Sequence, residues 1–150
     1  MHSLLTLGWL GDGEPVPAAR LAAGNDLPPA YLNKQLQALV RAGVLVSTPG
    51  PRGGFRLARP LSEITLMDVV AAVEGTEEAF RCTEIRRRGS GAAAADREFA
   101  EPCAISIAMR RAELAWRREL AAQSLADVKA TADRHAPNAA ARVRRFHGRG

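Results

Sequence analysis

Aromatic residues are scarce in this 150-residue chain: Phe, Trp and Tyr together make up 5% of it, whereas alanine is abundant. Alanine favours helices, and the shortage of aromatic residues argues against a β-sandwich or barrel. The sequence has no apolar run near the roughly 20 residues that a membrane-spanning helix needs, and no charged–apolar–small leader. We therefore expect a mainly helical, cytoplasmic protein of one domain that is long enough to bury a core.

Cysteine is also nearly absent, with only Cys82 and Cys103 in the chain. Two cysteines in a cytoplasmic protein do not indicate a structural disulfide, and their spacing is not that of a zinc ribbon. Catalytic patterns are missing as well: there is no Ser/His/Asp set, no Gly-rich phosphate loop after a strand and no recognisable pair of acids. The sequence predicts a protein that is not an enzyme.

Acidic residues are absent from one part of the chain and scarce in another. From Arg134 onward there are five arginines and no acid, which accounts for the formal net charge of +5 and leaves residues 1–133 neutral. Over residues 16–60, six cations stand against the single acid Asp26. The high pI is therefore a property of the tail. The excess of cations over acids in residues 16–60 places basic charge around one helix. We expect residues 136–150 to be a disordered, solvated tail, or one that adds nonspecific phosphate affinity.

The amphipathic stretch PPAYLNKQLQALVRAG, residues 28–43, is the segment around which the chain is organised. Pro29 suits the first turn of a helix, and Gly43 suits a left-handed cap at its end. The apolar residues fall at i, i+4, i+7 and i+8, on one stripe. These are Leu32, Leu36, Leu39 and Val40. The opposite face has an aromatic ring, amides and cations but no carboxylate, which is typical of a helix in a DNA major groove; a solvated surface helix is the alternative.

The segments on either side of this stretch favour the DNA-binding interpretation. Residues 16–23 (VPAARLAA) are expected to form a short helix with Pro17 near its first position, followed by a tight turn. After Gly43, VLVS and FRLARP are expected to be strands around the turn PGPRGG, with an arginine near the tip. A helix-turn-helix followed by such a hairpin is a winged helix rather than a plain surface hairpin. The candidate DNA-contacting residues are Tyr31, Asn33, Lys34 and Gln35 on the helix, and Arg52 and Arg56 on the wing.

Four further segments complete the expected architecture. Residues 2–10 (HSLLTLGWL) are expected to be the back half of a helix, ended by Gly11, Asp12 and Gly13. Capping boxes at TLMD (residues 65–68) and SLAD (residues 124–127) are expected to open two more helices, the first running through Val73. Between them, Pro102 begins a long helix with many apolar residues, which runs to about residue 122.

A small winged helix does not need this long helix for its own core. We therefore expect it to join two copies of the chain, because proteins that recognise two DNA half-sites are usually two-fold dimers. The predicted organisation is a winged helix-turn-helix domain over residues 1–75, a cysteine-containing sensor loop and dimerisation helix over residues 76–135, and the basic tail over residues 136–150.

The sequence resembles the family of IscR, NsrR and RsrR, winged-helix regulators that sense through an iron–sulfur cluster. The resemblance extends from about Leu4 to Val128. It rests on VPAARLA, AYLNKQLQALVRAGVLVS, GPRGGFRLARP and EITLMDVVAAVEG, followed by Cys82, Cys103, the long helix with Trp116, and SLADV. It implies a homodimeric transcription regulator, of which a repressor is the expected form, with a DNA operator as its partner.

The chain is most similar to the RsrR-like branch of that family, through its two widely spaced cysteines and the segment FRCTEIRRRG at residues 80–89. This resemblance implies a 2Fe–2S cluster, held by Cys82 and Cys103 of one subunit and by a histidine and a glutamate from the first helix of the other. His2 lies near the position of that histidine. The glutamate has no counterpart and would precede Met1. Replacing thiolates on one iron by nitrogen raises the cluster's potential.

Other readings of these residues remain open. Without the family resemblance, His2 is a frayed terminal residue, and the two cysteines are buried apolar thiols. A cluster-free regulator of the same fold would switch by cysteine oxidation or by binding a small ligand. An iron–sulfur electron carrier is the rival from another class, and a cation-faced helix beside a wing argues against it.

Overall fold

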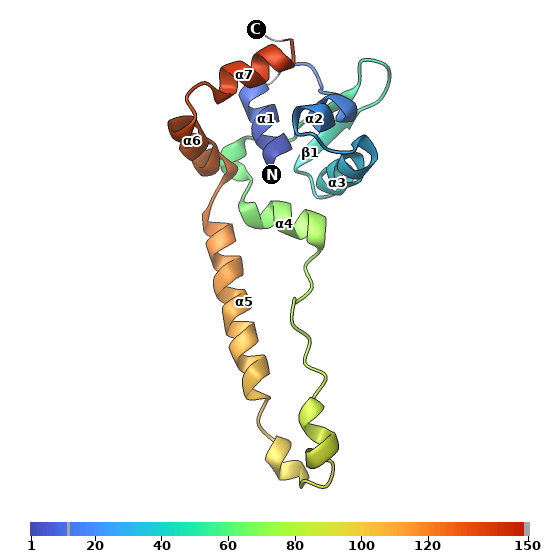
Figure 1. Ribbon diagram of the computed structural model, residues 1–150, viewed down its shortest axis with the longest axis vertical. Coiled ribbons are helices and arrows are strands. Elements are labelled where there is room, and N and C mark those ends of the chain that lie inside the picture. Colours follow the sequence, from blue (N-terminus) through green and yellow to red (C-terminus); the bar gives the residue numbers. More distant parts are fainter. Residues whose placement is uncertain (12, 149–150) are drawn as a thin grey trace. The chain divides into compact units, whose positions relative to one another are not determined.

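The computed structural model describes residues 1–11 and 13–148 (Figure 1). Its helices and strands in the described residues are α1 (His2–Leu10), α2 (Ala18–Gly24), α3 (Pro29–Arg41), β1 (Leu45–Thr48), β2 (Gly54–Leu57), α4 (Leu66–Glu74), α5 (Ala104–Ala122), α6 (Leu125–His135) and α7 (Ala139–Phe146). Four short 3-10 helices join them: η1 (Leu61–Glu63), η2 (Ile85–Arg87), η3 (Gly89–Gly91) and η4 (Asp96–Phe99). The expected class, mainly α with a small β-hairpin, is confirmed.

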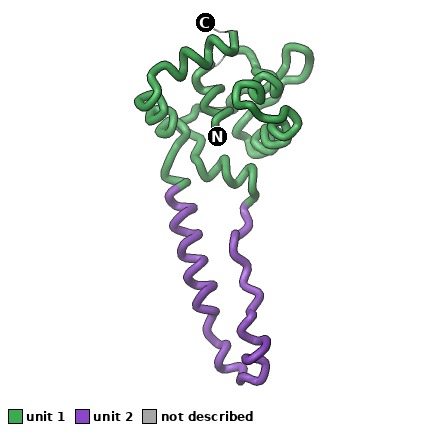
Figure 2. The backbone as a smooth tube through the Cα atoms, in the orientation of Figure 1, with its two compact units in different colours: residues 1–75, 120–150 green, residues 76–119 purple. Residues whose placement is uncertain are grey.

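The chain divides into two compact units, residues 1–75 with 120–150, and residues 76–119 (Figure 2). The core of the first unit combines one stripe of α3 with residues from α1, α2, the hairpin and the start of α6. Its largest fully buried side chains are Leu4, Leu21, Leu36, Val44, Leu45, Ile64 and Leu125. The stripe of α3 is buried as the sequence predicts, which leaves the polar face of this helix in solvent.

The ends of α3 also follow the sequence signals. Pro29 is the first residue of the helix, where its missing N–H costs no hydrogen bond. Gly43 has φ 70°, in the left-handed region. The Gly43 N–H donates to the Val40 carbonyl and the Val44 N–H to the Leu39 carbonyl, both at 3.0 Å, which is the Schellman pattern. This cap turns the chain directly from α3 into β1.

The hairpin β1–β2 is anchored to the segment before α2. The strands pair antiparallel, with Val46 opposite Arg56. On the other edge of β2, Phe55 exchanges two backbone hydrogen bonds of 2.9 Å with Val16. A Cβ on Gly54, which has φ 157°, would lie 2.4 Å from the Val16 carbonyl oxygen, so only glycine permits this approach. The wing is thereby fixed to the helix-turn-helix.

Two capping boxes meet in the first unit. Thr65 with Asp68 caps α4, and Ser124 with Asp127 caps α6, as the sequence predicts. Thr65 and Ser124 also form an antiparallel bridge, in which the Leu66 N–H donates to the Gln123 carbonyl at 2.9 Å. The starts of α4 and α6 are therefore joined although about 60 residues separate them.

The tail differs from the expectation of disorder over residues 136–150. In its described part, α7 is a helix whose end residues pack inward: Ala139 and His147 are buried, and Val143 is half-buried. These positions recur at i, i+4 and i+8, a stripe that the arginine-rich composition hides. Both α6 and α7 belong to the first unit, whereas the sequence grouped α6 with the sensor loop. Residues 149–150 and Asp12 lie outside the described residues.

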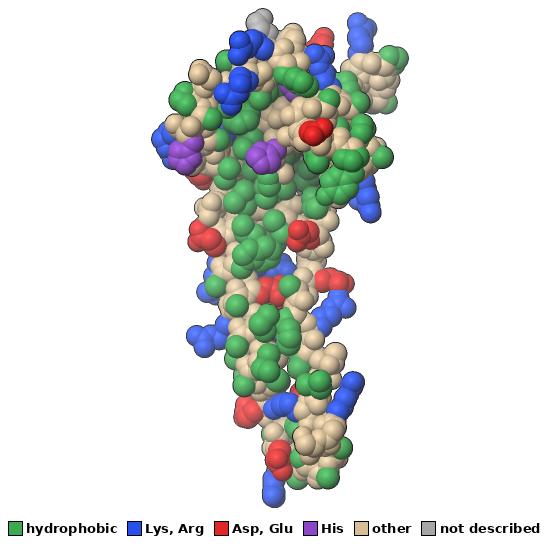
Figure 3. All heavy atoms as spheres, viewed as in Figure 1, with side chains coloured by type: hydrophobic (Ala, Val, Ile, Leu, Met, Phe, Trp, Pro, Cys, Tyr) green, Lys and Arg blue, Asp and Glu red, His purple; other side chains and the backbone are tan. Residues whose placement is uncertain are grey.

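The second unit contains the loop of residues 76–103 and the first part of α5. Polar contacts attach the start of this loop to the helix: the Ala79 N–H donates to Glu113 Oε2 at 3.1 Å, and Arg117 Nη2 donates to the Glu77 carbonyl at 3.0 Å. Large apolar side chains of α5 remain exposed, namely Ile105, Ile107, Met109, Leu114 and Trp116. Figure 3 shows hydrophobic side chains along this helix. Among the described residues, no helix is long and apolar enough to cross a membrane.

Candidate DNA interface and thiol site

The exposed face of α3 is polar and cationic. Tyr31, Asn33 and Lys34 are exposed, and Gln35 is half-buried. Lys34 and Arg41, seven residues apart, lie near the middle of this face, and neither forms an ion pair with a described residue. Cations without acidic neighbours are available to phosphates, so this face suits a polyanion.

The four candidate DNA-contacting residues of α3 lie on different parts of its exposed surface. Asn33 faces the wing, where it lines a hollow of about 540 Å³ with Gln37, Ser47 and Thr48. Tyr31 and Gln35 lie on the other edge of α3 and line a hollow of about 350 Å³ that also includes His2. Lys34 lies between these two edges. Gln37 and the two wing hydroxyls were missed from the sequence, although Gln37 follows Asn33 by four residues on the same helix.

The wing contributes two exposed arginines. Arg52 lies in the turn after β1 and Arg56 on β2, and neither has an ion-pair partner among the described residues. Arg59, close by in sequence, is different because Asp68 binds it at 3.2 Å. A wing with free cations at its tip and along one strand can contact phosphates or a narrow minor groove.

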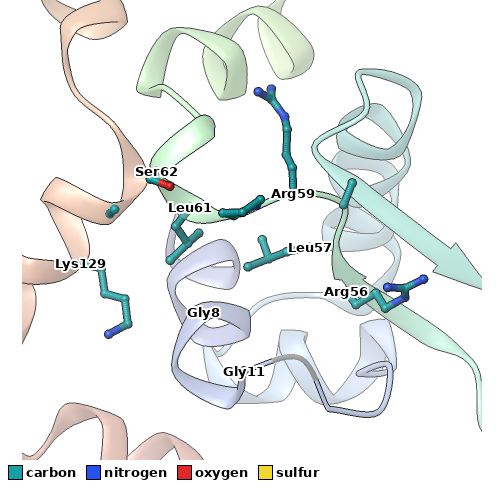
Figure 4. Close-up of a pocket in the computed structure, with 11 residues that line it drawn as sticks. Gly8, Gly11, Arg56, Leu57, Arg59, Leu61, Ser62 and Lys129 are labelled. Carbon is teal, nitrogen blue, oxygen red and sulfur yellow. The ribbon is translucent and has the colours of Figure 1, made fainter.

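The hollow beside Arg56 does not gather the nearby cations into one site. It has a volume of about 620 Å³ and lies between α1, β2, η1 and α6 (Figure 4). Arg56, Arg59 and Lys129 line it, but their charged groups point in three different directions, and Leu57 and Leu61 lie between them. The arrangement is unlike a binding site for a small anion, in which cations converge.

In the second unit, the structure brings Cys82 and Cys103 together. Cys103 is 8% exposed and directly precedes α5, so its sulfur accepts hydrogen bonds from the backbone N–H groups of Ser106 and Ile105. These N–H groups, followed by the positive charge of Arg86 and a hydrogen bond from the Cys82 thiol, lower the pKa of Cys103 from its usual value, against the opposing effect of burial. Cys82 is exposed.

Arg86 is held in place beside the two cysteines. Glu84, whose backbone lies in the left-handed region at φ 51°, accepts hydrogen bonds from Arg86 Nε at 2.6 Å and Nη2 at 3.1 Å. Arg86 Nη2 also donates to the Glu101 carbonyl at 3.0 Å, two residues before Cys103. The loop thus presents a thiol with a lowered pKa, a second thiol and a fixed cation. Sequence reasoning found both cysteines but not Arg86.

The third candidate ligand, His2, is exposed at the start of α1 in the first unit. Among residues 1–11 and 13–148 of a single chain, no group of three or more His, Cys, Asp or Glu side chains could hold a metal ion. One subunit therefore provides two thiol ligands, whereas a 2Fe–2S cluster that is bound by thiolates alone needs four.

Known proteins resemble this chain in sequence. YffB of Lactococcus lactis, which bears the name of an HTH-type transcriptional regulator, is 34% identical over 128 residues, 85% of this chain and 80% of YffB. The HTH-type transcriptional regulator IscR of Vibrio atlanticus is 35% identical over 80 residues, 53% of this chain and 46% of IscR. The match thus spans about half the length of that relative.

Solved structures share the fold. CymR, the global cysteine regulator of B. subtilis, superposes with a TM-score of 0.61 at 22% identity, over 87% of this chain and 92% of CymR. IscR of T. potens gives a TM-score of 0.62 at 19% identity, over 89% of this chain and 83% of IscR. The family model of Rrf2, described as an iron-dependent transcriptional regulator, matches residues 1–131. The chain therefore belongs to the Rrf2 family of winged-helix transcription regulators.

Proposed function

We propose that two copies of this chain form a cytoplasmic DNA-binding repressor that reports redox state through Cys82 and Cys103. The observation that carries the DNA-binding part is the acid-free, exposed face of α3 beside a wing whose two exposed arginines form no ion pair with a residue that the structure describes. In this arrangement α3 enters the major groove, with Lys34 on a phosphate and Asn33 and Gln35 at base edges, while Tyr31 adds an aromatic contact. Arg52 and Arg56 contact the flanking backbone.

In vitro selection from random DNA duplexes tests this part. The purified protein should enrich one palindromic site and bind it at least about 1,000-fold more tightly than a scrambled duplex at the same salt concentration. Equal affinity for the two duplexes would show that the protein is not a sequence-specific regulator. The selected duplex then serves in every binding experiment below.

For the sensor, we propose the RsrR-like arrangement, in which Cys82 and Cys103 hold a 2Fe–2S cluster with His2 of the second subunit. The paired thiols support this, since cysteine thiolates are the usual cluster ligands and the lowered pKa of Cys103 favours the form that binds iron. A bound cluster would supply a reversible one-electron change. His2 shares a hollow with Tyr31 and Gln35 of α3, so a change in its ligation reaches the DNA-contacting helix through a short path.

The cluster proposal predicts a coloured protein. Anaerobic purification or reconstitution with iron and sulfide should give visible absorption with two irons and two sulfides per site, and Cys82→Ala or Cys103→Ala should abolish it. His2→Ala should leave the cluster more quickly lost to a chelator, because the thiols alone do not complete the iron coordination. Ser106→Ala, three residues after Cys103, is the matched control and should keep the colour, because it leaves the backbone N–H in place. Wild-type protein that takes up no iron contradicts the cluster.

The proximity of the two cysteines favours a second candidate, a thiol switch. Hydrogen peroxide would oxidise the Cys103 thiolate to a sulfenic acid with release of hydroxide, and the Cys82 thiol would then attack this sulfur and release water to form the disulfide. This candidate predicts a colourless protein whose DNA affinity changes on peroxide treatment and recovers with dithiothreitol. Peroxide without effect on DNA affinity in the colourless protein would contradict it.

A further inference from the structure

Helix α7 is held firmly against the helix-turn-helix although it lies beyond residue 131, where the family match ends. Arg20 Nη2, on α2, donates to the Phe146 carbonyl at 3.3 Å, and Arg144 Nη1 donates to the Trp9 carbonyl, on α1, also at 3.3 Å. Ala139 and His147 are buried at the two ends of the helix. The position of α7 relative to α2 is therefore fixed by packing as well as by hydrogen bonds.

The outward face of α7 carries positive charge. Arg142 and Arg145 are exposed and three residues apart, so they lie on the same side of the helix. Neither forms an ion pair with a described residue, and the sequence from Arg134 onward contains no acid. Figure 3 shows Lys and Arg side chains over α7 and at the tip of the hairpin.

The end of α7 lies beside the wing on the surface. A hollow of about 300 Å³ is lined by Arg20 of α2, Arg52 of the wing, and His147 and Gly148 at the end of α7. Glu14 is the acid on its wall. Arg20 of α2 and Arg52 of the wing thus lie next to the C-terminal end of α7, and this region adjoins the part of the wing that we assign to DNA.

We propose that α7 is a second phosphate-binding element, in which Arg142 and Arg145 contact the duplex backbone outside the segment that α3 reads. This rests on the proposed DNA-binding function and extends it to a longer footprint. The chemistry is that of guanidinium groups without acidic neighbours, which bind phosphate strongly but carry no sequence information. An acidic protein surface is the competing occupant of such a face.

Salt titration of DNA binding tests the proposal. We compare wild type with Arg142→Ala/Arg145→Ala on a long duplex, which carries the selected site with flanks of about ten base pairs, and on a short duplex that ends at the site. On the long duplex the double variant should lower the slope of log K against log[salt] by about two units, since each phosphate contact contributes about 0.9. A scrambled long duplex should lose the same factor in affinity, and the short duplex should bind unchanged.

Two controls separate this effect from others. Arg88→Ala/Arg97→Ala removes the same charge from exposed positions of the second unit and should keep the wild-type slope. Arg142→Lys/Arg145→Lys, which keeps the charge, should restore the slope. An unchanged slope for the alanine variant, or an equal loss in the charge-matched control, overturns the proposal. If Lys34→Ala still weakens operator binding in that case, the proposed function stands and only the role of α7 fails.

Discussion

Cys82 lies close enough to Cys103 for its thiol to help lower the pKa of Cys103, although 20 residues separate the two along the chain. The loop closes because Arg86 binds Glu84 on one side and the Glu101 carbonyl on the other. Two further contacts come from Phe99, whose ring lies under the guanidinium groups of Arg86 at 5.6 Å and Arg87 at 4.5 Å. The cation next to the cysteines is thus part of the loop's own structure.

The first prediction concerns the protonation of Cys103. In Cys82→Ala protein, Cys103 should still ionise at a lower pH than an ordinary thiol, because the N–H groups of Ser106 and Ile105 stabilise its thiolate. Arg86→Ala should raise the pKa of Cys103 and Arg86→Lys should largely preserve it. Absorbance at 240 nm, followed against pH, measures the thiolate. A titration that is identical for the alanine and lysine variants would show that the charge of Arg86 has no effect on Cys103.

The second prediction concerns the stability of the capping box of α6. The Ser124 side chain, and then its backbone N–H, lower the pKa of Asp127. A carboxyl whose pKa is depressed in the folded state contributes stability above its unfolded pKa, near the usual 3.8, and loses it as the pH falls through the folded value. Ser124→Ala should therefore lower the urea midpoint more at pH 7 than at pH 3.

Ser62→Ala, which changes an exposed serine of η1 and no cap, is the control for this experiment. It should leave both midpoints near those of the wild type. If Ser124→Ala lowered the urea midpoint by as much at pH 3 as at pH 7, the ionised form of Asp127 would make no contribution to the stability that the capping box provides.

Local signals were enough to predict most of the first unit. Pro29, Gly43 and the two capping boxes each act within one turn of the chain, and the structure keeps all of them. The first strand was placed within one residue of β1, and the second began one residue after the start of β2 but was extended three residues beyond its end. Such features depend on neighbouring residues, so a single sequence reveals them.

Features that depend on distant residues were missed. Arg86 reaches the cysteines only because the loop folds back at Glu84, and α7 is ordered only because α1 and α2 accept its inward face. Likewise, Gln37 becomes a candidate contact once the Val16–Phe55 bridge fixes the wing beside α3. Contacts of this kind form between residues that are distant in sequence. They depend on tertiary packing and cannot be inferred from the spacing of residues along the chain.

The third prediction concerns assembly through α5. Ile105, Met109, Ala112 and Trp116 recur at i, i+4, i+7 and i+11 on one side of this helix, and the three large side chains are exposed. In the expected dimer, these side chains pack against the same side of α5 in a second copy of the chain. Met109→Glu should therefore give monomers in sedimentation, because a buried unpaired charge is strongly unfavourable. Ala115→Glu, exposed on another side of the helix, should stay dimeric. An intact dimer for Met109→Glu would place the interface elsewhere.

The last prediction distinguishes two kinds of contact on α3. Lys34 lies in the middle of the exposed face with a flexible cationic side chain, and Gln35 lies at one edge with an amide that can pair with a base. Lys34→Ala should weaken binding to selected and scrambled duplexes by the same factor and lower the salt slope by about one unit. Gln35→Ala should leave the slope unchanged and cost roughly 1–3 kcal/mol at the selected site alone. Arg134→Ala on α6 is the charge control for Lys34→Ala. Fluorescence anisotropy titrations at several salt concentrations give both quantities, and unchanged isotherms for Lys34→Ala and Gln35→Ala would remove α3 from the DNA interface.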